Sequence, residues 1–159
     1  MKKIWKILCL LVWTVLPLKC RKRNNLSYGE IFNKIEFAEL KLKLGIGTTP
    51  IDFVDCIHDA NGNPSDFLQG YCLNGVISYV TPISDFILFH EMIHRKHWVE
   101  NKRYKPYCKL IEDSFKNDTF FLRKWAGRLK YYLLWYETDA CYYGYRLAFA
   151  YNKHKNKTK

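Results

Sequence analysis

Two histidines and a glutamate at helical spacing form the motif of this sequence that could do chemistry. His90, Glu91 and His94 make up the pattern HExxH. Residues four apart lie on one face of a helix, so both imidazoles can bind one metal ion. Glu91 lies beside them and can act as general base toward a water molecule that the metal activates. The flanking residues are apolar, which predicts a buried motif in which Glu91 requires a partner or a metal.

A catalytic zinc site needs a third protein ligand, and two downstream residues are candidates. His97 follows His90 by two helical turns, about 10 Å along the axis, so one ion cannot reach both on a straight helix. We expect His97 to be solvated or to lie on the substrate side. Glu137 is 43 residues beyond His94, enough for a loop, a helix and a return. We therefore predict that His90, His94 and Glu137 are the metal ligands.

Small side chains follow Glu137 at helical spacing. Ala140, Cys141, Gly144 and Ala148 lie three, four, seven and eleven residues further along the chain. Such a stripe lets a second helix approach closely, so that a short carboxylate can reach a ligand position on it. The alternative is a helix crossing without a metal, with Glu137 exposed or paired beside it.

The motif and the downstream Glu-x-x-Ala together resemble the gluzincin clan of zinc metallopeptidases, especially small members with an HExxH…ExxA pattern. The resemblance covers about residues 74–148. It implies that Zn2+ is bound by His90, His94 and Glu137. It also implies hydrolysis of a peptide bond in a peptide or protein substrate, with Glu91 as the general base.

Two further points follow from the resemblance. In that clan an edge strand before the motif helix pairs with the extended substrate backbone, and a strand is expected here at 75–80. Many relatives carry Asp at the position of Cys141, where it orients a ligand histidine. Here either another acid (Asp85, Asp113 or Asp139) does this or the histidine is held less firmly. The oxyanion donor remains open among four nearby residues: Tyr142, Tyr143, Tyr145 and Arg146.

Helices and a short sheet are expected to position these residues. Ser27 and Glu30 form a capping-box pattern, Asn74-Gly75 is a turn, and Thr81 or Ser84 can cap the motif helix. The expected elements are helices over 27–44, 83–99, 107–115 and 119–151 and strands over 50–56 and 75–80. The pattern predicts an α+β fold: a mostly helical, zincin-like domain with a short sheet whose edge strand precedes the HExxH helix.

The net charge of +11 lies at the two ends of the chain. Residues 1–23 and 152–159 hold 11 of the 26 bases and no acid, which leaves 15 bases against 15 acids in residues 24–151. Nucleic-acid binders usually carry their basic surface on the fold itself, so this distribution argues against a nucleic-acid partner. We expect one metallopeptidase-like domain over 24–151 and a basic, disordered tail over 152–159.

The first 23 residues have the composition of a targeting segment. An uncharged apolar run of 12 residues, 7–18, follows three lysines. It is short for a membrane-spanning helix but matches a signal or membrane anchor, so we expect a membrane-associated or exported protein. The alternative is an interfacial helix on a cytoplasmic protein.

Two questions stay open at this level. Cys56, Cys72, Cys108 and Cys141 form either two disulfides or four buried thiols. The competing function is a non-enzymatic domain that binds a membrane or another protein, its HExxH motif being accidental or holding a structural metal.

Overall fold

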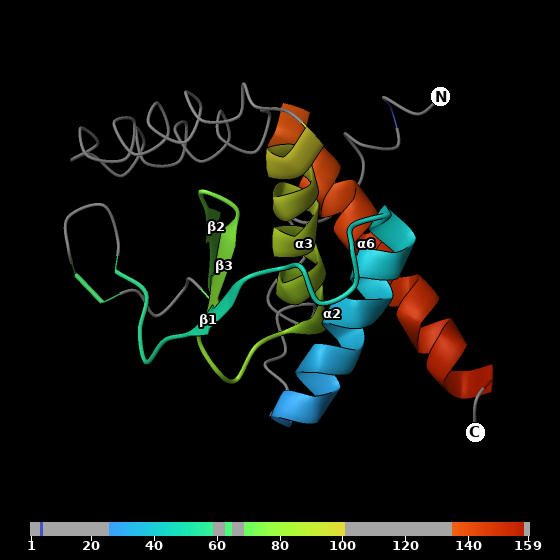
Figure 1. Ribbon diagram of the computed structural model, residues 1–159, viewed down its shortest axis with the longest axis horizontal. Helices are drawn as coiled ribbons and strands as arrows, with labels where there is room; N and C mark the ends of the chain where they lie inside the picture. The colour runs from blue at the N-terminus through green and yellow to red at the C-terminus, as the bar shows by residue number, and fades with distance from the viewer. Residues whose placement is uncertain (1–3, 5–25, 59–62, 65–68, 101–134, 158–159) are drawn as a thin grey trace.

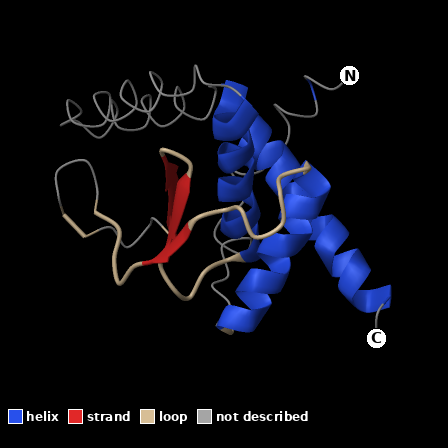
Figure 2. Cartoon of the chain, in the orientation of Figure 1, coloured by secondary structure: helices blue, strands red, loops and turns tan. Residues whose placement is uncertain are grey.

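The computed structural model describes residues 4, 26–58, 63–64, 69–100 and 135–157. Within this part, three helices and a three-stranded mixed sheet form the predicted α+β architecture (Figure 1; Figure 2). The sheet lies on one side of helix α3, Asp85–Glu100. Helices α2, Tyr28–Leu42, and α6, Trp135–Lys157, lie on the other.

Helix α2 begins and ends by local signals. The Ser27 hydroxyl accepts a hydrogen bond from the Glu30 N–H at 3.3 Å, and the Glu30 carboxylate accepts one from the Ser27 N–H at 3.1 Å, which confirms the capping box. Lys43 then adopts a left-handed conformation (φ 59°) that ends the helix slightly earlier than expected. The buried face of α2 carries apolar residues of the predicted spacing, and these join the core: Ile31, Ile35 and Ala38.

The sheet corrects one prediction. Strand β3, Val76–Tyr79, was expected at an edge, but it lies between β1, Ile51–Phe53, and β2, Gly70–Leu73. It pairs parallel to β1 and antiparallel to β2. The reason is the turn at Asn74 and Gly75, whose φ angles of 52° and 81° fold β2 directly back against β3. Among the described strands, β2 therefore occupies the edge next to α3.

Helix α6 corrects a second prediction, since it continues to Lys157 where a disordered tail was expected from residue 152. Other predictions lie outside the described residues: the segment 1–23 apart from Ile4, the helix over 107–115 and the start of the helix over 119–151. Among the described helices, none is both long and apolar enough to span a membrane. Among the described cysteines, Cys56, Cys72 and Cys141, no disulfide is formed.

Candidate metal centre

The polar motif lies on the buried face of helix α3. Ser84 caps the helix by accepting a hydrogen bond from the Ile87 N–H at 3.3 Å, one of the two caps expected. His90, Glu91 and His94 are 7%, 6% and 4% exposed. Their neighbours on the helix are core residues, so the packing of apolar side chains holds three ionisable groups out of water, as predicted.

Helix α6 crosses α3 at close range where the motif begins. A Cβ atom at Gly144 would lie 3.1 Å from the backbone nitrogen of His90 and 3.2 Å from its Cα. Ala140 and Cys141 are fully buried in the same contact. The small-residue stripe therefore does what its composition predicted: it brings Glu137, only 2% exposed, to the motif helix.

The donor atoms of three side chains converge at this crossing. His90 Nε2 and His94 Nε2 are 3.0 Å apart. The two oxygens of Glu137 lie 3.3 Å from His90 Nε2 and 3.1 Å from His94 Nε2. Donors about 2.0–2.1 Å from a tetrahedral zinc ion are separated from one another by about 3.3 Å. The spacing of the three side chains is thus close to that of ligands around one ion, and this buried group could bind a metal.

The electrostatics of the group also fit a cation. Burial by itself would lower the pKa of His90, but Cys141 and Glu137 raise it well above its usual value. Burial opposes ionisation of Glu137, yet His94 and His90 hold the pKa of this carboxyl well below its usual value. Within the described residues, Glu137 Oε2 has no hydrogen-bond partner of good geometry. Three electron-pair donors so close together require protons or a metal ion between them.

Glu91 is fixed from the opposite side by the edge strand. The backbone N–H of Cys72 in β2 donates a hydrogen bond to its carboxylate. Gly70 allows this approach, since a Cβ there would lie 3.3 Å from Glu91 Cγ and 2.9 Å from the Tyr79 ring. Burial raises the pKa of Glu91 despite the opposing charges of His90 and His94. The carboxylate is therefore buried, basic and adjacent to the donor group.

The far side of the His90 imidazole contacts Cys141. The Cys141 sulfur lies 3.8 Å from His90 Nδ1, and its side chain is fully buried. Of the acids considered for this place, Asp85 pairs with Lys34 at 2.6 Å, Asp139 lies 3.9 Å from His97, and Asp113 is outside the described residues. Cys141 thus occupies the place beside His90 for which an acid was expected.

His97 does not join the donor group, as its spacing predicted, but it is not solvated. Its side chain is 11% exposed and its ring centroid is 6.0 Å from that of His94. Burial, with the nearby charge of His94, lowers the pKa of His97 to about 4. Among the four oxyanion candidates, Arg146 lies over the ring of Tyr142, which contacts Tyr143, while Tyr145 packs on Phe86.

Two contributors were missed by sequence reasoning. Gly70 and Cys72 sit in β2, a strand that was not predicted. A signal for them exists, because the Asn74-Gly75 turn was recognised and a tight turn before a strand implies a partner strand before the turn. For the contact of Cys141 with His90, the resemblance already marked position 141 as one that orients a ligand histidine, but it did not indicate that the thiol itself would make the contact.

The comparisons with known proteins identify no relative: no protein-family model, curated protein or solved structure matches this chain.

Proposed function

We propose that this protein is a zinc-dependent peptidase of the gluzincin type, with a zincin-like fold. His90, His94 and Glu137 bind the zinc ion, and Glu91 is the general base. The observation that carries this proposal is the convergence of donor atoms from three side chains at 3.0–3.3 Å, on two crossing helices, beside a buried glutamate.

The donor set favours zinc in a catalytic rather than a structural role. Two imidazoles and one carboxylate are typical of catalytic zinc, whereas structural zinc usually has four protein ligands. The described residues supply three donors in one group. Zinc bound in this way supplies Lewis-acid chemistry, lowering the pKa of a water molecule and polarising a carbonyl group.

The protein's own part in the chemistry falls to Glu91. Its raised pKa, caused mainly by burial, makes the carboxylate a better proton acceptor near neutral pH than an exposed glutamate. The hydrogen bond from the Cys72 N–H restricts its orientation. Glu91 is therefore positioned to take a proton from water and to hold it until the leaving amine requires it.

A peptide substrate is supported by the edge of the sheet. Val80 N–H donates to the Gln69 carbonyl at 2.9 Å, so the alternating antiparallel pattern directs the backbone groups of Gly70 and Cys72 away from β3. This outer edge lies next to Glu91, because Cys72 bonds to it. Because the Cys72 N–H is engaged by Glu91, an extended peptide added along β2 would use the outward backbone groups of Gly70, and it would pass the donor group, a role we had expected of β3.

The location of the activity is part of the same proposal. The basic, apolar segment 1–23 would direct the chain to a membrane or out of the cell. The competing reading, a non-enzymatic membrane-associated or protein-binding domain, would use the metal for structure alone.

Zinc content and peptide cleavage separate these possibilities. We expect one zinc per wild-type chain, loss of zinc in His90→Ala and Glu137→Ala, and retained zinc without peptide cleavage in Glu91→Gln. Glu36→Gln, the same change at an exposed position on α2, is the matched control and should keep both properties. Circular dichroism of the chelated proteins separates loss of zinc from loss of folding.

Three results would contradict the proposal. A wild-type protein that folds and never takes up zinc would remove the metal site. Cleavage by Glu91→Gln at the wild-type rate would remove the general base. Zinc that is bound without any cleavage of an unfolded protein substrate would favour the structural alternative.

A further inference from the structure

Helix α6 has a strongly basic outer face. Between Ala140 and Lys157 it holds four bases and no acid. Arg146, Lys153 and Lys157 are separated by seven and four residues, so they lie on one side of the helix, and all three are exposed. Phe149, on the same side, is 74% exposed.

A lysine of helix α2 extends this basic face. Lys41 is exposed and lines a shallow hollow between α2 and α6 together with Lys153 and Lys157. The floor of the hollow is formed by Phe37 and Ala150. We call the set Lys41, Arg146, Phe149, Lys153 and Lys157 the α2/α6 basic face.

The charges of this face are not neutralised by the fold. Some lysines elsewhere in the described structure have acidic partners: Lys34 pairs with Asp85 at 2.6 Å, and Lys96 with Glu100 at 3.1 Å. By contrast, none of the four bases of the α2/α6 basic face has an ion-pair partner among the described residues. Glu36 lines only the neighbouring hollow, toward the start of α2.

Exposed apolar side chains accompany these bases. Leu40 is 62% exposed and Ile46 60% exposed, and both line the neighbouring hollow between α2 and α6. With Phe149, they place large apolar groups at the protein surface among the lysines. Bases interleaved with exposed Phe, Leu and Ile are typical of surfaces that lie in the interface of a lipid bilayer.

We infer that the α2/α6 basic face binds an anionic membrane surface. The lysines and Arg146 contact lipid phosphates and carboxylates, and Phe149 enters the boundary between headgroups and acyl chains. A lipid surface is favoured over nucleic acid because large exposed apolar side chains, Phe149, Leu40 and Ile46, accompany the bases, and the interface of a bilayer can bury them. The inference does not depend on the metal centre.

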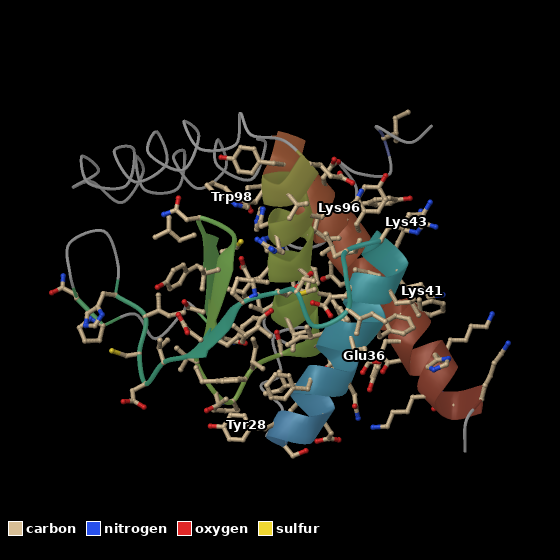
Figure 3. All side chains as sticks on the ribbon, in the orientation of Figure 1. Tyr28, Glu36, Lys41, Lys43, Lys96 and Trp98 are labelled. Carbon is tan, nitrogen blue, oxygen red and sulfur yellow. The ribbon has the colours of Figure 1, made fainter. Side chains whose placement is uncertain are left out.

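The position of this face leaves the candidate site accessible. In Figure 3, Lys41 and Lys43 lie on the side of the molecule away from the sheet, and α3 lies between the sheet and these two lysines. A membrane bound there would lie on the opposite side of α3 from the sheet. Because a single weak membrane signal gives only marginal attachment, this face would also add to the attachment expected of segment 1–23.

The test is co-sedimentation of the full chain with vesicles, either of phosphatidylcholine alone or of an equimolar mixture with phosphatidylserine. We expect binding to the mixed vesicles only, and weaker binding at high salt. Lys153→Gln and Lys157→Gln should each weaken binding about fivefold. Phe149→Ser should weaken it by a similar factor, about fivefold, without changing the salt dependence.

Lys96→Gln is the matched control, because this lysine is on α3 and is neutralised by Glu100. It should bind as wild type does. Wild-type binding by the Lys153, Lys157 and Phe149 variants would overturn the inference and assign any attachment to segment 1–23. Tighter binding to single-stranded RNA than to the mixed vesicles, lost in the same variants, would overturn it in favour of a nucleic-acid surface.

Discussion

The sulfur of Cys141 on helix α6 lies 3.8 Å from Nδ1 of His90 on helix α3, while Nε2 of the same ring faces His94 and Glu137. Cys141 therefore contacts the Nδ1 side of the imidazole, and this contact directs Nε2 toward His94 and Glu137. A partner in this place fixes the orientation of a ligand histidine and strengthens its metal binding.

We expect Cys141→Ala to weaken zinc binding by about tenfold, because the ring of His90 loses its partner. Cys141→Ser, which restores a hydrogen-bonding group of similar size, should recover part of that loss. Competition with a fluorescent zinc chelator measures both. Equal zinc affinity in wild type and Cys141→Ala would show that packing alone orients His90.

Gly144 sets the distance between the two helices that carry the donors. A methyl group at this position would meet the His90 backbone at 3.1–3.2 Å, so Gly144→Ala forces α6 away from α3. We expect a loss of about 1–3 kcal/mol in unfolding free energy and weaker zinc binding, because Glu137 moves with its helix. Urea unfolding of the chelated protein measures the first effect.

Gly29 provides the matched control for Gly144. It lies in helix α2, and a Cβ there would meet nothing within 4 Å. Gly29→Ala should stabilise the protein by roughly 0.5 kcal/mol, since alanine favours the helix. If both substitutions had the same effect, the contact between Gly144 and His90 would not limit the approach of the helices.

The parts of this structure that were predicted are those encoded locally. Three local patterns indicated a helix start or the buried face of a helix: the capping box at Ser27, the HExxH spacing and the small residues after Glu137. These signals were sufficient to bring His90 and Glu137 together, because the face of a helix follows from its periodicity.

The parts that were missed depend on partners distant in sequence. Strand β2 is only four residues long and begins with a glycine, so its own sequence gives little indication of a strand. It becomes a strand because the turn at Asn74 places it against β3. Residues 152–157 lack an apolar face of their own, yet the helix continues while His154 packs at 5.6 Å from the Phe37 ring. His97 is buried by the packing of α6, where it lies close to Asp139.

Burial of His97 predicts a loss of stability in acid. Burial, followed by the charge of His94, lowers its pKa to about 4, against about 6.5 in an unfolded chain. Between these values the unfolded state binds more protons, so the free energy of unfolding falls as pH falls from about 6.5 to 4, by about 3 kcal/mol. Urea unfolding of the chelated protein across this range measures the change.

His97→Gln should remove that part of the pH dependence. His58→Gln, at an exposed position, serves as the control and should retain the wild-type dependence. Parallel curves for wild type and His97→Gln would show that His97 is protonated in the folded protein at the same pH as in the unfolded chain.

Glu39 anchors the loop that leads into the sheet. Its side chain is 1% exposed, and its two carboxylate oxygens accept hydrogen bonds from the backbone N–H groups of Gly47 at 2.7 Å and Thr49 at 2.8 Å. Glu39→Ala leaves these donors without their acceptor, so we expect a loss of about 3 kcal/mol in unfolding free energy. Glu36→Ala, exposed on the same helix, should change it by less than about 0.5 kcal/mol.

The two variants also separate stability from metal binding. The loop that Glu39 anchors contacts the motif helix through the Arg95 side chain, which donates to the Thr48 carbonyl at 3.4 Å. Arg95 is not one of the proposed metal ligands, so Glu39→Ala should lower stability while leaving the zinc affinity of the folded protein unchanged. Zinc titration below the unfolding temperature checks this. A parallel loss of zinc affinity would mean that the sheet, and not the two crossing helices alone, determines the geometry of the three donors.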